Sequence, residues 1–427
     1  MASKALREVD AQRLLARLIS EYSDGEINLS NRYIGVGPKT DLVKLAANNP
    51  WLKECKLVVK VDQLIKRRGI NNLVLLNASY DEAVEWISER MEKEVTLDGT
   101  TGVLKNFVIS EFVPHEKEDE YYCAIQSVRE GDEILFYHAG GVDVGDVDSK
   151  AKRVTVGIWD VEQVDEQYIV NNLLSEVPAE RQPRVATFLK FLFKAYVKAN
   201  FSYLEINPLA FVDSDAVPLD LAAKLDDTAH FECKGMWGDI SFSSPFGRES
   251  NEAERFVERL DANSGSSLKL TILNPQGRIW SLVAGGGASV IYADTVADLG
   301  CGNELANYGE YSGNPTEGET FEYTKTVLDL MTKQKDPLGR EKVLLIGGGI
   351  ANFTDVSKTF DGIIRALRHF ESKLKDVGVK IYVRRGGPNY KDGLEKIRNA
   401  GHELGLSIEV YGPETHMTRI VKMALAA

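Results

Sequence analysis

The sequence is poor in cysteine and contains no long apolar run, and each absence excludes a class of protein. The 427 residues include four cysteines that lie far apart without CxxC spacing, namely Cys55, Cys123, Cys233 and Cys301. This pattern excludes a zinc ribbon and argues against a disulfide scaffold. No apolar run reaches the roughly 18 residues that a membrane span needs, and the N-terminus lacks the residue order of a secretory signal. We therefore expect a cytoplasmic protein without a membrane partner.

Basic residues are outnumbered by acidic ones. The chain carries 51 lysines and arginines against 64 aspartates and glutamates, which gives a net charge of -13. A protein that binds nucleic acid or an anionic membrane normally presents a basic field, so we expect no nucleic-acid partner. Net charge is a property of the whole chain, and a local site for a small anion stays open.

Histidine is also scarce, and none of the histidines stands in a catalytic pattern. The six histidines are His115, His138, His230, His369, His402 and His416. None has metal-ligand spacing, and none stands beside a serine or cysteine nucleophile pattern. We assign none of them a catalytic role, so a reaction that passes through a phosphorylated histidine would have to take it from another chain.

The order of predicted elements changes along the chain. Asp10 is predicted to cap an amphipathic first helix. A turn-rich stretch over residues 236–266 indicates a boundary between two halves. Strands and helices alternate beyond it, with strands expected at residues 269–273, 279–284, 343–346, 379–383 and 407–411. This alternation predicts an α/β domain whose parallel sheet has helices on both faces.

A basic turn follows an apolar strand in the run LVVKVDQLIKRRG, residues 57–69. Lys60 could contact a nucleotide phosphate as a point charge, while Arg68 and Gly69 bring a guanidinium and the backbone close to it. The alternative is a solvated basic loop after an edge strand. The pattern alone does not decide between them.

A polar hairpin is predicted over residues 203–227, with its turn at Asp213-Ser214-Asp215. Asn207 and Asp220 stand at similar distances from this turn, so we expect them to face each other. An amide oxygen, a carboxylate and nucleotide phosphates are hard oxygen ligands that suit Mg²⁺. The hairpin therefore predicts a magnesium site, and an ordinary polar hairpin is the alternative.

Two triple glycines, Gly285 to Gly287 and Gly347 to Gly349, each follow a predicted strand, and each is expected to open a helix. Neither fits the P-loop or the G-x-G-x-x-G pattern. Unpaired N–H groups and the helix dipole at such a mouth favour an anion. Close packing of helix on strand, which also uses glycine, is the alternative.

An arginine pair, Arg384 and Arg385, ends a predicted strand in the run VRRGGPNY. Strand alternation sends the two side chains to opposite faces, so we expect one of them to reach a site. A guanidinium fork suits a carboxylate. A surface arginine pair is the alternative.

Several of these runs resemble known families. EINPL with Asp220, LVVK with its basic turn and GGGASVIYADT resemble the ATP-grasp β subunit of succinyl-CoA synthetase. The chain resembles the ATP-citrate lyase family more closely, over essentially its whole length. The runs that carry this resemblance are LVVKVDQLIKRRG, GGVDVGDVD, NPQGRIWSLVAGGGASVIYADT, ELANYGEYSG, GGGIANFTDV, YVRRGGPNY and YGPETHMT. The chain looks like the smaller, nucleotide- and citrate-binding chain of a two-chain form.

The resemblance implies a fold and a reaction. The fold is α/β, with an ATP-grasp fold of two α+β subdomains over residues 1–112 and 113–242, then a flavodoxin-like, doubly wound domain like that of succinyl-CoA synthetase β over residues 243–427. The reaction converts citrate, CoA and ATP into acetyl-CoA, oxaloacetate, ADP and phosphate. ATP and Mg²⁺ are the implied cofactors. The implied partner, in a hetero-oligomer, carries the phosphohistidine, the CoA site and a citrate-synthase-like module.

The resemblance also implies roles for individual residues. ATP would be held by Lys60, Arg68, Gly69, Glu111, Val113 and Glu120. Asn207 and Asp220 would hold Mg²⁺, and a second cation loop would use Asp261, Ser264 and Ser266. Citrate would be bound at Gly313, Asn352, Thr354, Phe370 and Arg385. The helix mouth facing the phosphohistidine would be Gly285, Gly286, Gly287 and Ala288.

The sequence departs from the family pattern at two positions, and three other functions stay open as alternatives. Val61 stands where the family often has proline, and Phe370 stands where animal forms are expected to have tyrosine, so a hydroxyl contact to citrate is expected to be missing. The alternatives are the large subunit of a citryl-CoA synthetase, a succinyl-CoA synthetase β chain, and a non-catalytic sensor of citrate or nucleotide. The partner chain would distinguish the enzymes. The preference for ATP or GTP and the oligomer size stay open.

Overall fold

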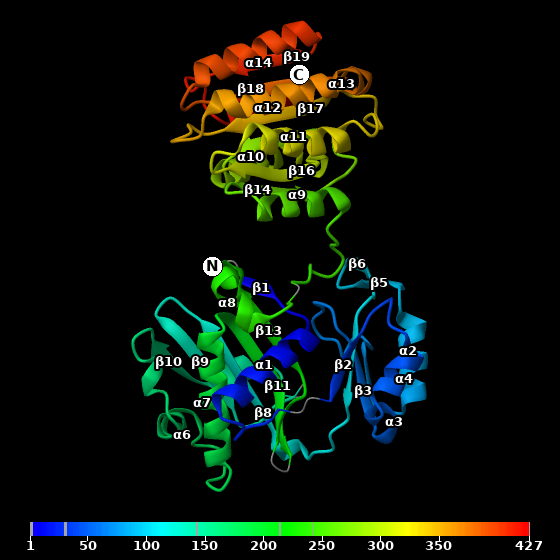
Figure 1. The fold of residues 1–427 in the computed structure, drawn as a ribbon, viewed down its shortest axis with the longest axis vertical. Helices are drawn as coiled ribbons and strands as arrows, with labels where there is room; N and C mark the ends of the chain where they lie inside the picture. Colours follow the sequence, from blue (N-terminus) through cyan, green and yellow to red (C-terminus); the bar gives the residue numbers. More distant parts are fainter. Residues whose placement is uncertain (1–2, 30–31, 142–143, 213–214, 241, 427) are drawn as a thin grey trace. The chain divides into compact units, whose positions relative to one another are not determined.

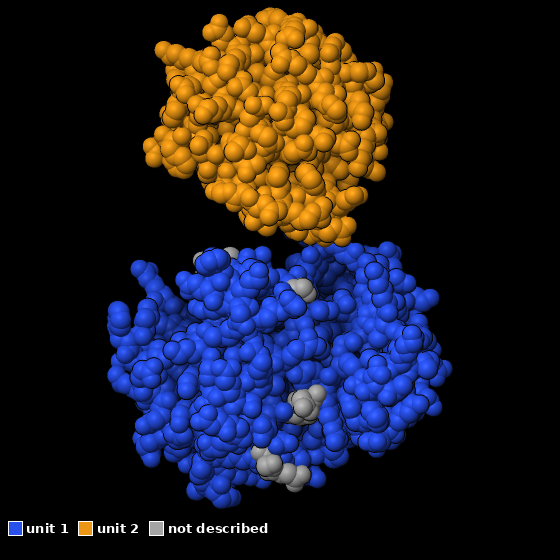
Figure 2. All heavy atoms as spheres, in the orientation of Figure 1, with its two compact units in different colours: residues 1–249 blue, residues 250–427 orange. Residues whose placement is uncertain are grey.

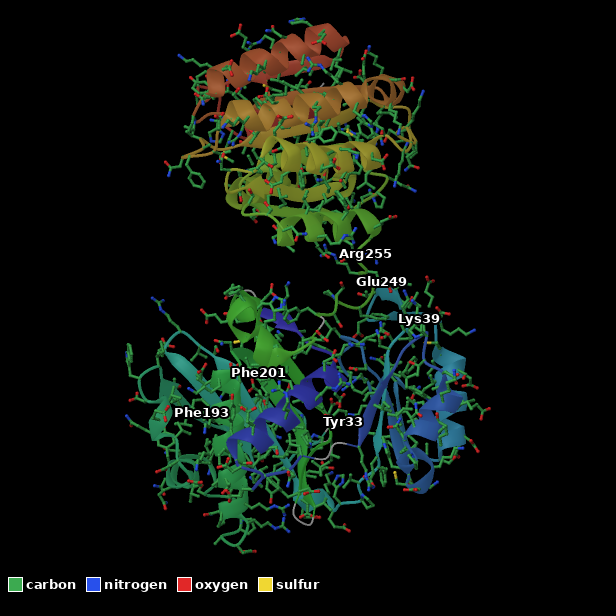
Figure 3. All side chains as sticks on the ribbon, in the orientation of Figure 1. Tyr33, Lys39, Phe193, Phe201, Glu249 and Arg255 are labelled. Atoms are coloured by element: carbon green, nitrogen blue, oxygen red, sulfur yellow. The ribbon has the colours of Figure 1, made fainter. Side chains whose placement is uncertain are left out.

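The chain forms two compact units. The computed structural model describes residues 3–29, 32–141, 144–212, 215–240 and 242–426. Unit 1 is Met1–Glu249 and unit 2 is Ser250–Ala427 (Figure 2). Glu249 and Arg255, labelled in Figure 3, lie on either side of the division. The domain boundaries at residues 113 and 243 stay predictions. Within the described ranges, each helix is too short or too polar to cross a lipid bilayer.

The larger sheet of unit 1 has seven strands, in the order β1-β13-β11-β8-β9-β10, with β12 paired to β11. Its antiparallel neighbours β8, β9, β11 and β13 form the centre (Figure 1). The bounds are β1 (Ser3–Ala5), β8 (Glu120–Ser127), β9 (Gly131–Tyr137), β10 (Lys152–Gly157), β11 (Phe201–Val212), β12 (Asp215–Pro218) and β13 (Leu221–Asp226). Helices of this part are α1 (Glu8–Tyr22), α5 (Val147–Lys150), α6 (Glu166–Leu173), α7 (Gln182–Lys198) and α8 (His230–Trp237).

The smaller sheet of unit 1 has four strands in the order β2-β7-β3-β4, all antiparallel, and a separate β5-β6 hairpin accompanies it. The bounds are β2 (Tyr33–Val36), β3 (Leu57–Val61), β4 (Val74–Ala78), β5 (Glu94–Leu97), β6 (Thr100–Val103) and β7 (Phe107–Glu111). Its helices are α2 (Leu42–Asn48), α3 (Trp51–Glu54) and α4 (Tyr80–Arg90). Each of the two sheets has its own apolar core, which agrees with the two-part architecture expected for this half.

Helix α1 packs on α7 and buries an apolar stripe, but it does not begin where the sequence predicted. Its leucines at positions 14, 15 and 18 are all buried, because they recur at helical spacing on one face. The predicted cap at Asp10 is wrong, since the helix begins at Glu8 and Arg7 makes no side-chain cap. Asp62, which follows β3, accepts hydrogen bonds from the backbone N–H of Glu8 (2.6 Å) and Val9 (3.3 Å) instead. A side chain from a distant segment therefore satisfies the first turn.

Unit 2 confirms the predicted parallel sheet. Six strands run in the order β14-β16-β15-β17-β18-β19, and only the edge pair β14–β16 is antiparallel. The strands are β14 (Ser267–Ile272), β15 (Ile279–Ala284), β16 (Asn307–Ser312), β17 (Lys342–Gly348), β18 (Val379–Arg384) and β19 (Ser407–Tyr411). The helices are α9 (Glu252–Ala262), α10 (Gly286–Asp298), α11 (Glu317–Met331), α12 (Val356–His369), α13 (Glu371–Val377), α14 (Tyr390–Leu404) and α15 (Arg419–Leu425).

Helices cover both faces of this sheet. One apolar core joins the sheet to α9, α11, α12 and α14, and a second joins it to α10 and α15. The central strands β15, β17 and β18 are buried on both sides, as a parallel sheet under two helical layers requires. The carboxyl ends of the parallel strands meet at one edge, where α/β sheets place their ligands.

Candidate functional site

Unit 1 contains a cavity of about 580 Å³ between its two sheets. Residues of the smaller sheet line one wall, including Tyr33 of β2 (Figure 3), and residues around β11 and β13 line the other. The predicted site residues that line it are Lys60, Gly69, Glu111, Val113, Glu120, Asn207 and Asp220. Seven residues from three stretches of the sequence, three of which only the resemblance implied, thus meet around one space.

Arg68 and Lys60 join a buried ionic network at this cavity. The Lys60 ammonium lies 2.8 Å from one carboxylate oxygen of Glu8 and also donates to the Leu219 carbonyl. Arg68 donates to the other Glu8 oxygen at 2.6 Å and forms a further ion pair with Asp220. The side chains of Glu8 and Lys60 are 3% and 7% exposed, so this ion pair is screened from water, whereas the Asp220 side chain at the edge of the network is 45% exposed. The alternative of a solvated basic loop is therefore excluded for Lys60.

The charges in this network shift the pKa values of its acids in opposite directions. Burial alone would raise the pKa of Glu8, but the Lys60 and Arg68 cations outweigh it and hold that pKa below its ordinary value. Burial and the negative charge of Glu8 raise the pKa of Asp62 to about 6, although two backbone N–H groups partly offset the rise. Glu8 is thus the anion that balances both cations, and Asp62 is the weaker acid beside it.

Asn207 and Asp220 face each other, as the hairpin predicted. The Asn207 N–H donates to the Asp220 carbonyl at 3.0 Å, next to the antiparallel pairing of β11 with β13. Two residues of the predicted turn, Asp213 and Ser214, lie outside the described residues. The Asn207 side-chain oxygen accepts the N–H of Gly141 at 2.9 Å, and the Asp220 side chain is 45% exposed. One amide oxygen and one accessible carboxylate at neighbouring backbone positions fit the donor set that Mg²⁺ prefers.

The opposite end of the cavity is lined by polar groups that already have partners. The Glu120 carboxylate lies 3.1 Å from His115 Nε2, and His115 Nδ1 lies 2.7 Å from the Val113 carbonyl. Arg32 pairs with Glu111 at 3.0 Å, and its carbonyl accepts the Glu111 N–H. These contacts hold the residues predicted for adenine and ribose around one wall of the cavity.

The first triple glycine of unit 2 opens a helix as predicted. Gly285 has a φ of +97°, a conformation that favours glycine, and α10 begins at the next residue. A side chain on Gly286 would collide with the carboxylate of Glu310, so that carboxylate lies at the predicted phosphohistidine-facing mouth. Ala288 follows within the first turn. The mouth therefore already holds the carboxyl group of an acidic residue, which the sequence did not predict.

The second triple glycine does not open a helix, so that prediction is wrong. Gly347 and Gly348 belong to β17, and α12 begins only at Val356, capped by the Asp355 side chain. A Cβ on Gly347 would collide with the ring of Tyr292, and one on Gly348 would lie 2.8 Å from Arg385 Nη1. These glycines make room for side chains from other strands and helices, which is the packing alternative.

The arginine pair points to opposite faces and is buried, so a surface pair is excluded. Arg384 donates to the carbonyls of Thr415 (2.9 Å), Gly348 (2.9 Å) and Pro413 (3.2 Å). Arg385 donates to the Gly349 carbonyl at 2.9 Å, and its buried Nε has no partner among the described residues. Burial lowers the pKa of Arg385 below its ordinary value. Three backbone carbonyls thus accept hydrogen bonds from Arg384, whereas the Nε–H of Arg385 has no acceptor among the described residues.

Four of the five predicted citrate residues lie at the same edge of the sheet. The Ala351 N–H donates to the Gly386 carbonyl at 2.9 Å, which ties the loop of Asn352 and Thr354 to Arg385. The Asp355 N–H donates to the Asn314 side chain at 3.2 Å, which ties the same loop to Gly313.

Phe370 does not join this group. It follows α12, at the opposite end from Thr354, and a helix of 14 residues spans about 21 Å. Its side chain is only 4% exposed and packs in the apolar core. It also has no polar group, so we do not carry Phe370 forward among the residues of the proposed citrate site.

The predicted second cation loop has other contacts. The Asp261 carboxylate accepts the Leu268 N–H at 2.7 Å and pairs with Lys269 at 2.6 Å. The Ser264 hydroxyl accepts the Ser266 N–H at 2.9 Å. Within the described ranges, no cluster of three or more histidine, cysteine or acidic side chains could hold a metal ion. These contacts stabilise the turn between α9 and β14, and we do not carry the second cation site forward.

Sequence reasoning missed Glu8 and Asp62, which belong to the network beside the unit 1 cavity, and Glu310, which lies at the mouth of α10. A signal existed for Glu8, because Glu8 and Gln12 are polar residues at i and i+4 on the buried, mostly apolar side of α1. A polar pair in such a stripe indicates a buried partner. No comparable signal marks Asp62, whose partners belong to a different element.

Comparisons with known proteins agree with this architecture. A family model described as the ATP-citrate synthase ATP-grasp domain matches residues 2–237, and one described as ATP citrate lyase citrate-binding matches residues 248–427. The solved structure of ATP citrate lyase from Methanothrix soehngenii, in complex with citrate and coenzyme A, superposes with a TM-score of 0.92 at 48% identity over 100% of both chains.

Relatives of known sequence differ in length. The chain is 50% identical to ATP-citrate synthase of Homo sapiens over 425 residues, which is 100% of the chain but 38% of the human protein. It is 44% identical to ATP-citrate synthase alpha chain protein 2 of Arabidopsis thaliana, over 100% of the chain and 98% of the plant protein. The chain therefore spans less than half the length of the animal relatives and nearly all of the plant alpha chain. With an ATP-grasp unit followed by a citrate-binding unit, the chain belongs to the ATP-citrate synthase (ATP-citrate lyase) family.

Proposed function

We propose that this chain is the ATP- and citrate-binding subunit of an ATP-citrate lyase and acts with a second subunit. The observation that carries the proposal is the cavity of unit 1, where Lys60, Glu120 and the Asn207–Asp220 pair line one space. The near-complete match to a plant alpha chain supports a two-chain arrangement. The four separated cysteines, all unpaired, support a reducing, cytoplasmic location.

In unit 1, Lys60 and Arg68 bind the phosphates of ATP, and the backbone at Gly69 approaches them. Glu111 and Val113 line the adenine through backbone groups, and Glu120 binds the ribose. Since Lys60 and Arg68 are paired with Glu8 and Asp220 in the structure, the phosphates enter by exchange with carboxylates. Asn207 and Asp220 hold Mg²⁺, which when bound neutralises phosphate charge during transfer.

In unit 2, Arg385 supplies a guanidinium fork for a citrate carboxylate, and Gly313, Asn352 and Thr354 surround it. The support is the buried, unpartnered Nε of Arg385 at the carboxyl edge of the sheet. A buried donor without an acceptor is costly, so an anion that accepts from it is stabilised there. The archaeal relative of similar structure was solved in complex with citrate, which supports citrate as the anion.

The reaction is divided between the two subunits. The γ-phosphoryl group of ATP moves to a histidine nitrogen of the partner, which releases ADP, and then to a citrate carboxylate, which gives citryl phosphate. The CoA thiolate displaces phosphate to form citryl-CoA, and the partner cleaves this to acetyl-CoA and oxaloacetate. The mouth of α10, at Gly285, Gly286, Gly287 and Ala288, faces the phosphohistidine. All of these steps need the second subunit.

The test measures ADP formation with citrate, CoA and the copurified partner. Asp220→Ala should abolish ADP formation while citrate binding persists, because Asp220 lies in unit 1 and Arg385 in unit 2. Asp227→Ala is the matched control, since Asp227 pairs with Lys4 instead and does not line the cavity. Without the second subunit, the chain should bind Mg·ATP and citrate but should convert neither of them to product.

Two outcomes would contradict the proposal. Steady ADP release by the chain without a partner would show that the division of labour is wrong. Normal turnover by Asp220→Ala at limiting Mg²⁺ would remove Asp220 from the site. Accumulation of citryl-CoA with the native partner would instead identify a citryl-CoA synthetase.

A further inference from the structure

Three buried donors of unit 2 have no hydrogen-bond partner among the described residues. One is the hydroxyl of Thr324 in α11, and the other two lie near the carboxyl ends of β16 and β18. These two are the Nε of Arg385 and the hydroxyl of Tyr311, on side chains that are 2% and 1% exposed. Buried polar groups are nearly always paired, so unpaired donors in one domain need an explanation. Tyr311 and Arg385 come from segments that are far apart in sequence, at the end of β16 and just after β18.

The sheet brings these two donors to the same row. Tyr311 is opposite Ala284 of β15, and Ala284 is opposite Gly348 of β17. The side chain of Arg385 crosses over Gly348, because a Cβ there would lie 2.8 Å from Arg385 Nη1 and 3.1 Å from its Cδ. Gly348 thus lets the guanidinium extend from β18 across β17, toward β15 and β16.

Both side chains also lie on the same face of the sheet. Tyr311 belongs to the core under α11 and α12, and its ring centroid lies 6.2 Å from that of Tyr323 in α11. Val383 belongs to the same core, so strand alternation places Arg385 on this face. The same alternation places Arg384 on the other face, where it donates to the carbonyls of Pro413 and Thr415.

The positive charge of the Arg385 guanidinium is not balanced by a carboxylate of the described residues. No carboxylate of the described residues forms an ion pair with Arg385, and its electrostatic neighbours are Tyr311, Tyr292 and Arg384. Burial raises the pKa of Tyr311, with only a partial offset from Arg385, so its hydroxyl stays a neutral donor at pH 7. A buried cation and a neutral hydroxyl together suit a carboxylate with two acceptor oxygens.

We propose that Tyr311 is a further specificity-determining residue of the anion site, whose hydroxyl donates a hydrogen bond to a carboxylate of the polycarboxylate that Arg385 binds. This inference rests on the citrate site proposed for unit 2. It assigns a hydroxyl contact to the site, although residue 370, from which one would be expected, is a phenylalanine in the core. A buried water that bridges Tyr311 and Arg385 is the competing explanation.

The experiment is calorimetric titration of citrate into the full chain and into Tyr311→Phe. A hydrogen bond to a charged group corresponds to at least a 10-fold change in affinity, so the variant should bind citrate about 10-fold more weakly or worse. The Tm of the ligand-free variant should not fall, because the hydroxyl has no protein partner to lose. Mg·ATP affinity, a property of unit 1, should be unchanged, and the unchanged Tm shows that unit 2 is still folded.

Tyr323→Phe is the matched control. The Tyr323 hydroxyl is also buried, but it donates to the Lys269 carbonyl at 2.8 Å. Its removal should lower the Tm by about 2–4 °C and leave citrate affinity unchanged. If wild-type chain binds citrate and Tyr311→Phe binds it equally well, the inference is overturned and a bridging water explains the hydroxyl. If the wild-type chain binds no citrate, the proposed function fails before the inference is tested.

Discussion

The two units hold their buried cations in different ways. In unit 1, Lys60 and Arg68 share the carboxylate of Glu8, and Arg68 also pairs with Asp220. In unit 2, Arg385 is equally buried, yet no carboxylate of the described residues forms an ion pair with it. One site is electrically balanced by the chain itself, and the other has a positive charge that the chain does not balance.

This difference separates two kinds of anion binding. A phosphate that enters unit 1 must replace a carboxylate, so part of its attraction is offset by the ion pair that it breaks. A carboxylate that enters unit 2 supplies a charge that is missing. Because a phosphate must replace a carboxylate in unit 1, we expect nucleotide binding there to be readily reversible. In unit 2, we expect the bound anion to stabilise the folded unit.

The largest effect is expected when the balance of unit 1 is broken. Glu8→Ala leaves two buried cations without their shared carboxylate, and removal of one partner from a buried ion pair costs about 3–5 kcal/mol. Urea denaturation should detect this loss. Glu403→Ala is the control, because its pair with Arg368 is exposed, with side chains 59% and 52% accessible, and should change stability by less than about 0.5 kcal/mol. Equal, small losses in both variants would mean that the network is not screened from water.

The pH dependence of Asp62 gives the next largest effect. Its pKa is about 6 in the folded chain, against 3.8 for a free aspartate. Between these values the folded state holds a proton that the unfolded state has released, so stability falls as the pH rises through this window. The loss should approach about 2–3 kcal/mol at pH 7, and Asp62→Asn should abolish it. The urea midpoints of both proteins at pH 4 and pH 7 measure this loss. If the wild-type chain instead gains stability relative to Asp62→Asn between pH 4 and pH 7, the predicted direction of the pKa shift is wrong.

Arg385→Met tests the unbalanced charge of unit 2. The variant keeps the volume of the side chain but loses the fork, so citrate affinity should fall by roughly 10- to 150-fold, or about 1.5–3 kcal/mol. The ligand-free chain should be no less stable, in contrast to Glu8→Ala. Arg384→Met is the matched control, because Arg384 donates to three carbonyls and should lose stability with little change in citrate affinity. Equal losses of affinity would mean that the citrate site is misplaced.

The smallest effect is expected at the mouth of α10. Glu310 places a carboxylate beside Gly286, where it opposes any phosphoryl group that approaches. Glu310→Gln should therefore raise the affinity for inorganic phosphate about 2- to 5-fold, which corresponds to roughly 0.3–1 kcal/mol for a charge at a helix end. The phosphate-dependent rise in Tm measures it, with Glu322→Gln on α11 as the control. A weaker response in Glu310→Gln would show that this carboxylate assists the anion.

Sequence reasoning succeeded where the controlling geometry is local. Asn207 and Asp220 face each other because antiparallel strands keep residues at equal distances from their turn opposite one another. Arg384 and Arg385 diverge because side chains alternate along a strand. It failed at Gly347 to Gly349, where Gly347 and Gly348 accommodate Tyr292 and Arg385 from distant segments.

The sequence by itself determined the alternation of strands and helices, the facing pair of the hairpin and the opposed arginines, since each follows from a period of a few residues. Only the tertiary structure decided which charges are balanced. Glu8 meets Lys60 across 52 positions, and Arg68 meets Asp220 across 152. Coulombic and hydrogen-bond energies depend on separation in space and on exclusion of water, and the sequence separation of two residues fixes neither.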